Sequence, residues 1–326
     1  MIEIVSFLSE ETGLPESAIS RIVSSAPRRY KVYTIPKRNG GEREIAQPAR
    51  EVKALQRALL AGPLRNLKVH AAATAYRDGA SILDNAQRHA GSGRAILKMD
   101  FSNFFPSITD LDWRKYCHAN GVLDEEGITI TSSLLFRQVG SSGRLRLAIG
   151  APSSPALSNA LMFEFDDEIT RIVHEDKVIY TRYADDLTFS APRAGHLRDV
   201  VKNVKRVLRA LPYPKMRLNE DKTVLATTKY RRTVTGLTLA NDGSVTIGRW
   251  RKRILSAMMH RAKNGLLSIE ERQYLAGYLA FVAAIEPGFI VGLNARYGER
   301  VVSEIRRTVV LGSRVPLEIK NTMMRD

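Results

Sequence analysis

The chain has 326 residues, of which 44% are hydrophobic, and this length and composition predict a folded protein with a large core and two or three lobes. Its 50 Lys and Arg residues outnumber 34 Asp and Glu residues, and the resulting formal net charge of +16 predicts a polyanionic partner. A single cysteine, Cys117, excludes an intramolecular disulfide framework and a multi-cysteine zinc site.

The sequence shows no sign of export or membrane insertion. The N-terminus carries Glu3, Glu10 and Glu11 in place of the basic start and apolar run of a signal peptide. The most apolar stretch, residues 275–285, is shorter than the roughly 20 residues that span a bilayer. The sequence therefore predicts a cytoplasmic protein.

The first part of the chain predicts helices around a basic β-hairpin. Residues 1–27 have the spaced apolar side chains of a small helical extension. Residues 30–36 then alternate as a strand does, and the Gly-rich turn at 37–41 leads into a returning strand at 42–45. Helical spacing resumes at residues 52–60 and ends at a Gly-Pro pair.

The central part begins with a strand. Residues 95–100 predict a buried strand that ends in a carboxylate, whereas residues 111–148 are too mixed for an assignment. The Ser153-Ser154-Pro155 sequence supplies a hydroxyl cap and a first-turn proline, so we expect one helix from there to about Ile172. Two strands follow at 178–182 and 187–190.

The order of these elements predicts an α+β core, residues 28–240, followed by a separate helical lobe, residues 241–326. Residues 28–65 carry 10 Lys and Arg against 3 acidic residues, and residues 198–232, which include an amphipathic helix, carry 11 against 3. A third cluster, residues 249–253, places a Trp among cations. Each window alone fits a solvated helix face, but three on one chain favour nucleic acid.

Two adjacent carboxylates, Asp185 and Asp186, lie on the turn between the last two strands. Alone, such a pair fits a solvated turn, because Asp accepts backbone hydrogen bonds there. Asp100 also ends a strand, and adjacent strands of one sheet would bring it to the pair. Three carboxylates in a basic cleft suit two-metal phosphoryl transfer, in which one cation lowers the pKa of an attacking hydroxyl and the other steadies the triphosphate and the leaving oxygen.

Five stretches resemble, in order, motifs of a known family. Residues 100–107 (DFSNFFPS), 150–155 (GAPSSP) and 183–186 (YADD) are similar to successive motifs of reverse transcriptases. Residues 85–89 (NAQRH) and 234–236 (VTG) are similar to the NAxxH and VTG elements of bacterial retron reverse transcriptases. The resemblance covers roughly residues 28–240 and implies a right-hand polymerase fold with fingers, palm and a helical thumb.

The resemblance implies a catalytic centre that binds two Mg²⁺ ions, with Mn²⁺ as a substitute. The residues it assigns to the metals are Asp100, Phe101, Asp185 and Asp186. Lys222 matches a lysine that protonates departing pyrophosphate, although a solvated lysine is an equally good interpretation. The residues with catalytic roles are thus Asp100, Asp185, Asp186 and Lys222.

The resemblance also implies a nucleotide site and an RNA-binding surface. The nucleotide-binding candidates are Lys37, Arg43, Phe105, Gly150, Ala151 and Pro152. Phe105 matches the bulky residue that excludes a 2′-hydroxyl, with core packing as the alternative. The RNA-binding candidates are Asn85, His89, Val234, Thr235, Gly236, Arg249, Trp250, Arg251, Lys252 and Arg253. Ile149 departs from the Gln that many members carry before the glycine, which puts in doubt any hydrogen bond that Gln would supply.

The function implied is an RNA-dependent DNA polymerase that copies part of a cognate structured non-coding RNA. Retron enzymes start DNA synthesis from a guanosine 2′-hydroxyl and leave a branched RNA–DNA product, msDNA. The resemblance therefore implies the structured RNA, its msDNA product and dNTPs as partners. It also implies an effector protein from the same operon, with a role in anti-phage defence. Two alternatives stay open. One is another reverse transcriptase lineage, of the group II intron or diversity-generating type, and the other is an RNA-binding scaffold without activity.

Overall fold

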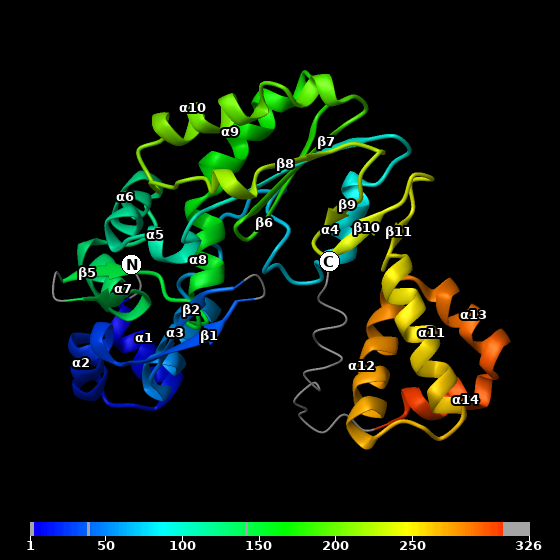
Figure 1. The fold of residues 1–326 in the computed structure, drawn as a ribbon. Coiled ribbons are helices and arrows are strands. Elements are labelled where there is room, and N and C mark those ends of the chain that lie inside the picture. Colours follow the sequence, from blue (N-terminus) through cyan, green and yellow to red (C-terminus); the bar gives the residue numbers. More distant parts are fainter. Residues whose placement is uncertain (1–2, 38–39, 141–142, 309–326) are drawn as a thin grey trace. The chain divides into compact units, whose positions relative to one another are not determined.

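The computed structural model describes residues 3–37, 40–140 and 143–308 (Figure 1). Two residues of the predicted hairpin turn, Arg38 and Asn39, and residues 309–326 of the predicted C-terminal lobe lie outside these ranges. The chain forms two compact units, and both are discontinuous in sequence. The first comprises Met1–Ser81 and Ala95–Leu225, and the second comprises Ile82–Arg94 and Ala226–Asp326.

The first unit begins with the predicted helices and hairpin, which are confirmed. Helices α1 and α2 precede a short 3-10 turn, the hairpin strands β1 and β2 pair in antiparallel register, and α3 follows. Their bounds are α1 Ile4–Thr12, α2 Glu16–Ser25, the turn Ala26–Arg28, β1 Tyr30–Pro36, β2 Glu42–Pro48 and α3 Arg50–Ala61. The strand β1 is exposed along nearly its whole length, so the hairpin projects into solvent.

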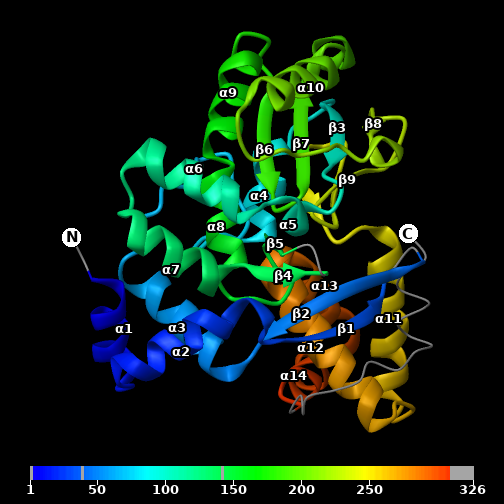
Figure 2. The same cartoon turned by 90° about the vertical axis from the view of Figure 1, so that its left-hand side faces the viewer.

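A four-stranded sheet forms the centre of the first unit, in the order β6-β7-β3-β8. Figure 2 shows β6, β7 and β3 side by side. The strands are β3 Ala95–Asp100, β6 Ile179–Tyr183, β7 Asp186–Ala191 and β8 Val224–Ala226. The three predicted central strands are therefore confirmed to within one residue at each end. Apolar side chains of the sheet and of the surrounding helices form one continuous core, from Ile4 to Met216.

The helix predicted from Ser153 to Ile172 is two helices, α8 Ser154–Leu161 and α9 Phe163–His174. Met162 separates them, because its ψ of 3° departs from helical geometry although its amide still donates to the Ser158 carbonyl. The predicted amphipathic helix is confirmed as α10 Val200–Ala210, which packs against α9. Two 3-10 turns, Ala194–Leu197 and Glu220–Lys222, flank α10 in sequence.

The segment that sequence reasoning left unassigned contains two capped helices and a small hairpin. Thr109 and Asp112 form a capping box at the start of one helix, and the Asp124 side chain accepts the Gly127 amide at the start of the next. The elements are α5 Phe104–Ser107, α6 Asp110–Asn120, α7 Glu125–Leu135, β4 Arg137–Val139 and β5 Arg144–Arg146.

The second unit combines a helix from the first third of the chain with a sheet and helices from the last third. Helix α4 packs on a three-stranded sheet of order β11-β10-β9. The elements are α4 Ile82–His89, β9 Arg232–Val234, β10 Leu237–Leu239, β11 Val245–Thr246, α11 Arg249–Lys263, α12 Ile269–Ile285, α13 Pro287–Tyr297 and α14 Glu299–Arg306. This sheet crosses the domain boundary predicted at residue 240, because β10 pairs with strands on both sides of that position.

Two side chains join the segment Ile82–Arg94 to the region of the sheet. The Thr235 hydroxyl donates to the Ile82 carbonyl at 3.0 Å, and the Arg232 guanidinium donates to the Arg94 carbonyl at 2.6 Å. The remaining helices confirm the predicted helical character of the C-terminal region as far as it is described. Within the described ranges, no helix has both the length and the apolar surface needed to cross a bilayer.

Candidate active site

Strand pairing brings Asp100 to Asp186. The two residues face each other directly across the antiparallel pair β3–β7, so their side chains lie on the same face of the sheet. Tyr183 pairs with Asp186 across β6–β7, which leaves Ala184 and Asp185 as the two-residue turn. The Phe101 amide donates to the Asp185 carbonyl at 3.0 Å and fixes the turn against the end of β3.

The turn has an unusual backbone. Ala184 has a φ of 57°, in the left-handed region that a residue with a Cβ rarely adopts. A strained conformation persists only where its surroundings hold it in place. Here the buried Arg182 guanidinium donates to the Ala184 carbonyl at 3.3 Å.

The pKa values of the turn carboxyls are raised. Burial, and next the Asp185 carboxylate, raise the pKa of Asp186 to about 6. Burial, and next the Asp100 carboxylate, raise the pKa of Asp185, while Lys222 and Arg43 oppose that rise. A bound cation would relieve the repulsion between these partly buried carboxylates, and hard divalent cations prefer oxygen ligands. The carboxylate oxygens are therefore of the donor type that a hard divalent cation prefers.

A lysine neutralises Asp100 in this structure. The Lys222 ammonium donates to both carboxylate oxygens of Asp100 at 3.0 Å. Among the described residues, no three His, Cys, Asp or Glu side chains lie close enough to ligate one ion as they stand. Lys222 thus lies beside Asp100 in an ion pair, and its catalytic role stays a prediction.

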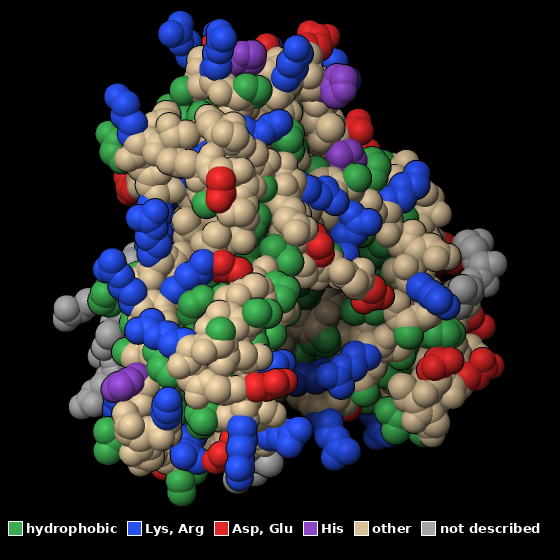
Figure 3. All heavy atoms as spheres, turned by 90° about the vertical axis from the view of Figure 1, so that its right-hand side faces the viewer, with side chains coloured by type: hydrophobic (Ala, Val, Ile, Leu, Met, Phe, Trp, Pro, Cys, Tyr) green, Lys and Arg blue, Asp and Glu red, His purple; other side chains and the backbone are tan. Residues whose placement is uncertain are grey.

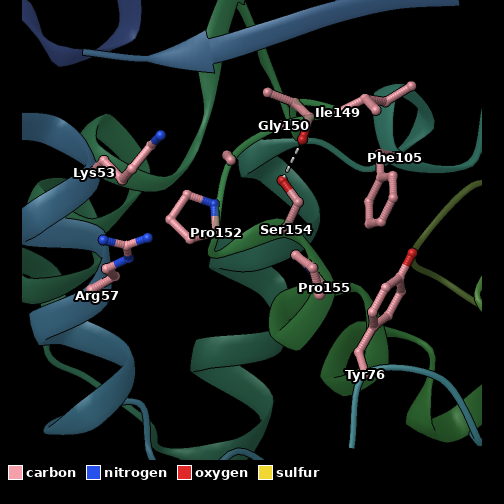
Figure 4. Close-up of a pocket in the computed structure, with 11 residues that line it drawn as sticks. Lys53, Arg57, Tyr76, Phe105, Ile149, Gly150, Pro152, Ser154 and Pro155 are labelled. Atoms are coloured by element: carbon pink, nitrogen blue, oxygen red, sulfur yellow. Dashed lines mark hydrogen bonds between the residues drawn. The ribbon is translucent and has the colours of Figure 1, made fainter. Parts of the chain in front are cut away.

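A pocket of about 340 Å³ contains four of the predicted nucleotide-binding residues (Figure 4). These are Phe105, Gly150, Ala151 and Pro152. Gly150 has a φ of +117°, and a Cβ there would lie 3.1 Å from the Ala46 carbonyl oxygen, so the loop requires glycine. The Ser154 hydroxyl holds the loop by donating to the Ala148 carbonyl at 2.7 Å. The backbone carbonyl of Ile149 accepts the Ala46 amide at 2.8 Å, joining the loop to β2.

Three further residues line the same pocket, and sequence reasoning missed them. Figure 4 shows Lys53 and Arg57, from α3, on one side and Phe105 with Tyr76 on the other. The spacing of Lys53 and Arg57, four residues apart on a predicted helix, was the available signal for the basic side. Tyr76 offered none, because it follows a run of small residues with no periodicity.

The two hairpin candidates differ in how the structure places them. Arg43 is exposed on β2, yet it lies close enough to Asp185 to oppose the effect of burial on the pKa of that carboxyl. Lys37 is exposed at the end of β1, where its amide donates to the Gly41 carbonyl at 2.9 Å. Triphosphate binding by either residue stays a prediction.

Comparison with known proteins decides the family. A family model for "Reverse transcriptase (RNA-dependent DNA polymerase)" matches residues 35–239. The retron Ec83 reverse transcriptase of Escherichia coli is 39% identical over 281 residues, which cover 85% of this chain and 90% of that protein. The chain belongs to the retron reverse transcriptases.

Further relatives agree with this assignment. The retron Mx162 reverse transcriptase of Myxococcus xanthus is 33% identical over 83% of this chain, although the match spans only 60% of that longer protein. A telomerase from Candida albicans, solved with a fragment of telomeric RNA, superposes with a TM-score of 0.50 at 14% identity, covering 98% of this chain and 66% of that one. This likeness concerns the fold alone and confirms the α+β polymerase architecture.

Family membership establishes the coarse activity. The retron reverse transcriptase is an RNA-directed DNA polymerase, so it uses an RNA template and dNTPs. Enzymes of this family use divalent cations in general. Because the relatives are retron enzymes, the alternatives of an intron-encoded or diversity-generating lineage are set aside.

The two elements typical of retron enzymes come together in the second unit. Helix α4 carries the NAQRH sequence, and the VTG sequence forms the end of β9 and the turn into β10. The side chains of Asn85, His89 and Val234 are fully buried. Burial argues against direct contact of these three side chains with RNA, and their contribution is to shape the surface that α4 and the sheet present.

The basic cluster at the start of α11 has a mixed arrangement. Arg249, Trp250 and Arg253 are exposed, whereas Arg251 donates to the Gly236 carbonyl at 2.6 Å and Lys252 pairs with a glutamate of the same unit. Basic side chains are more frequent than acidic ones on the face drawn in Figure 3. RNA binding by this cluster, and by Thr235 and Gly236, stays a prediction.

The buried His89 should make the stability of the retron reverse transcriptase depend on pH. Burial, with Arg94 and Arg88 as further causes, lowers the pKa of His89 to about 3, whereas the unfolded chain takes up that proton near pH 6.5. The unfolded state therefore binds more protons between these values, and the free energy of unfolding should fall by up to about 1.4 kcal/mol per pH unit as the pH drops from about 6 towards 3. Urea unfolding of wild type and His89→Gln at several pH values measures this, and parallel pH slopes for the two proteins would contradict it.

Proposed function

We propose that Asp100, Asp185 and Asp186 hold two Mg²⁺ ions, with Mn²⁺ as a substitute, and that Phe101 completes the metal site. The observation that carries the proposal is the register of β3 and β7, which sets Asp100 against Asp186 with Asp185 in the adjoining turn. When bound, the cations lower the pKa of the attacking hydroxyl and stabilise charge on the triphosphate.

The protein's own residues bind, orient and protonate the substrates. Arg43 and Lys37 on the projecting hairpin bind the triphosphate, and the fork of Arg43 suits bidentate contact with phosphate. The Gly150 loop lies beneath template and nucleotide, where small residues allow close approach. Glycine at this position also keeps the loop close to β2. Lys222, whose ammonium pairs with Asp100, would donate a proton to departing pyrophosphate.

The two compact units correspond to the parts of a right-hand polymerase. The first unit supplies the fingers and palm, with the helical extension at its start. The helices α11 to α14 of the second unit serve as a thumb, and the exposed Arg249, Trp250 and Arg253 bind structured RNA by stacking and by phosphate contacts. Similarity to retron enzymes over most of the chain supports this division.

The specific product proposed is branched msDNA. Synthesis starts from a guanosine 2′-hydroxyl in a cognate structured RNA, copies part of that RNA and leaves DNA joined to RNA. The support is the 39% identity to a retron reverse transcriptase across nearly its full length. A role in anti-phage defence, together with an effector protein from the same operon, follows from the same relationship.

The product distinguishes 2′ priming from ordinary priming. The gene is expressed with its flanking DNA, total nucleic acid is isolated, and the DNA 5′ end is tested for labelling by a polynucleotide kinase. We expect a short single-stranded DNA whose mobility increases after RNase digestion and whose 5′ end keeps at least one ribonucleotide after alkaline hydrolysis, because a 2′-linked ribose lacks the free 2′-hydroxyl that alkaline cleavage of its DNA bond requires. A DNA whose 5′ end is free after alkaline hydrolysis, as priming from an RNA 3′-hydroxyl would give, would overturn the branched-product proposal.

Phe105→Ala should admit ribonucleotides. The ring lies half-buried against Phe104 and lines the pocket, so its removal opens space where a 2′-hydroxyl would otherwise collide. Removal of a wall of this size should reduce the preference for dNTPs over rNTPs by about 10- to 100-fold. Steady-state incorporation of dGTP and GTP on one RNA template measures the ratio, and an unchanged ratio would leave Phe105 with a packing role only.

A further inference from the structure

A short segment outside the five motifs is attached to the strand that leads into the carboxylate turn. Ala73 forms a parallel bridge with Arg182 of β6. The Thr74 amide donates to the Arg182 carbonyl at 2.8 Å, and the Arg182 amide donates to the Ala72 carbonyl at 2.8 Å. Residues 72–75 are buried, so this segment extends the central sheet by a few residues just before the turn.

A fully buried ionic cluster lies behind the same turn. The Arg182 guanidinium makes a bidentate pair with Asp166 of α9, at 2.7 and 2.9 Å, and both side chains are completely inaccessible. Tyr180 donates its hydroxyl to Asp166 at 2.7 Å. The remaining guanidinium nitrogen, Nη1, donates to the Ala184 carbonyl in the turn and to the Asn159 carboxamide oxygen at 3.2 Å.

Asn159 connects this cluster to the segment. Its oxygen accepts from Arg182, and its nitrogen donates to the Ala75 carbonyl at 2.9 Å, so one buried carboxamide links the guanidinium to the residue before Tyr76. Asn159 is 1% exposed and lies on α8, which begins at the Gly150 loop. The turn and the segment are therefore held by the same side chain, Arg182.

Tyr76 is placed by this attachment. Its φ of 60° is in the left-handed region, an outlier for an aromatic residue that the surroundings must hold. Its ring is 51% exposed, lies 6.2 Å from the ring of Phe105 and lines the pocket opposite Lys53 and Arg57 (Figure 4). A half-exposed ring in a strained backbone, beside the residue proposed to select the sugar, has a position suited to contact with a nucleotide.

We propose that Tyr76 is a second specificity-determining residue, which packs with Phe105 against the sugar of the incoming deoxynucleotide. Asn159 is the positioning residue that fixes Tyr76 through the Ala75 carbonyl. The inference rests on the proposed sugar-selecting role of Phe105. The contact is made by the ring face, since a ring face offers rigid apolar area without needing its hydroxyl.

The variants that test the contact are Tyr76→Ala and Tyr76→Phe. Tyr76→Ala should raise the KM for dNTPs about 10-fold, the effect expected for loss of one aromatic packing contact, and should lower dNTP/rNTP selectivity, with little change in kcat. Tyr76→Phe should behave as wild type. Equal losses in the two variants would show that the hydroxyl acts instead of the ring and would overturn the proposal, as would a Tyr76→Ala enzyme with wild-type KM and selectivity.

The variant that tests positioning is Asn159→Ala. We expect its KM and selectivity to shift in the same direction as those of Tyr76→Ala, and the double variant to be no worse in KM than Tyr76→Ala alone, because Asn159 acts through Tyr76. Additive effects on KM in the double variant would overturn the positioning role.

Thr131→Ala is the matched control for lost stability. Thr131 is also completely buried in the first unit and also has polar partners, the Trp113 indole and the Gly127 and Ile128 carbonyls. No residue of α7 lines the pocket. Thr131→Ala should lower the free energy of unfolding about as much as Asn159→Ala does, and should keep the wild-type KM for dNTPs. If Thr131→Ala raises KM as much as Asn159→Ala does, Asn159 has only a structural role. Phe105→Ala, measured alongside, distinguishes failure of this inference from failure of the proposed role of Phe105. If Phe105→Ala changes dNTP/rNTP selectivity and Tyr76→Ala does not, only the role of Tyr76 is refuted. If Phe105→Ala leaves selectivity unchanged, the proposed sugar selection by Phe105 is refuted as well.

Discussion

Asp185→Asn combined with Asp186→Asn should abolish DNA synthesis and leave RNA binding largely intact. Two of the three candidate carboxylates would lose their charge, and with it the ability to hold divalent cations. Metal ions supply several kcal/mol of transition-state stabilisation, and each 1.36 kcal/mol is tenfold in rate, so the loss should reach at least about 10³-fold. Primer extension on a homopolymer RNA template with Mg²⁺ measures synthesis, and RNA affinity is measured on the same preparations.

Stability provides a second measurement on these variants. Because burial and mutual repulsion raise the pKa values of both carboxyls, removal of the charges should leave the free energy of unfolding unchanged or increase it. Asp110→Asn is the matched control, since the pKa of this half-buried carboxyl of the first unit is also raised by burial and its side chain is outside the candidate site. If the double variant loses RNA binding, Asp185 and Asp186 have a structural role. If it synthesises DNA at the wild-type rate, the catalytic residues lie elsewhere.

Arg182→Met should destabilise the first unit by about 3–5 kcal/mol, because it leaves the Asp166 carboxylate buried without its partner. The combined change Arg182→Met with Asp166→Leu should recover most of that loss, since a buried ion pair is often replaced by apolar residues at little cost. Chemical unfolding of the wild type, the single variant and the double variant measures both effects.

Activity should not follow stability in this series. The double variant still lacks the guanidinium that donates to the Ala184 carbonyl and to Asn159, so the carboxylate turn loses the group that holds its strained backbone. We expect synthesis to remain at least about tenfold below wild type, as befits a lost buried hydrogen bond to a charged donor. Recovery of full activity together with stability would mean that Arg182 contributes to folding alone.

Much of the catalytic centre could be predicted from the sequence because its signals are local. The strand ending at Asp100 and the strands flanking Asp185 have clear apolar patterns, and the carboxylates lie at their ends. Residues at the ends of two paired strands lie close together. The approach of Asp100 to Asp186 could therefore be predicted by assuming only that their two strands are neighbours in one sheet. Gly150 came from the resemblance of residues 150–155 to a reverse transcriptase motif, and no signal in the sequence alone indicated its contact with β2.

The features that were missed depend on contacts between distant residues. The attachment of residues 72–75 to β6 involves backbone groups over a hundred positions apart in sequence, and small side chains leave no periodic trace of it. Arg182 occupies an ordinary position in a strand pattern, where a basic residue reads as solvent-facing, yet Asp166 on another element makes its burial possible. The interruption at Met162 was also invisible, because the apolar spacing continues across it.

The composition of the second unit also could not be predicted from the sequence. The boundary predicted at residue 240 lies within a small sheet, in the connection between β10 and β11. The segment Ile82–Arg94 was assigned to the preceding core because it lies there in sequence. Only the burial of Asn85 and His89 on the sheet side of α4 reveals where it belongs.

The division of the chain has a consequence for its synthesis. Ile82–Arg94 leaves the ribosome long before the strands that it packs on, which begin at Arg232. At 5–20 residues per second, the intervening stretch of roughly 140 residues takes about 7–30 s to translate. During that interval the α4 segment lacks the strands that it packs on in the folded protein, and the chain passes between the two units three times. No single proteolytic cut can therefore release the C-terminal unit with its α4 helix, and a fragment that starts at Ala226 would expose the face of the sheet that α4 normally covers.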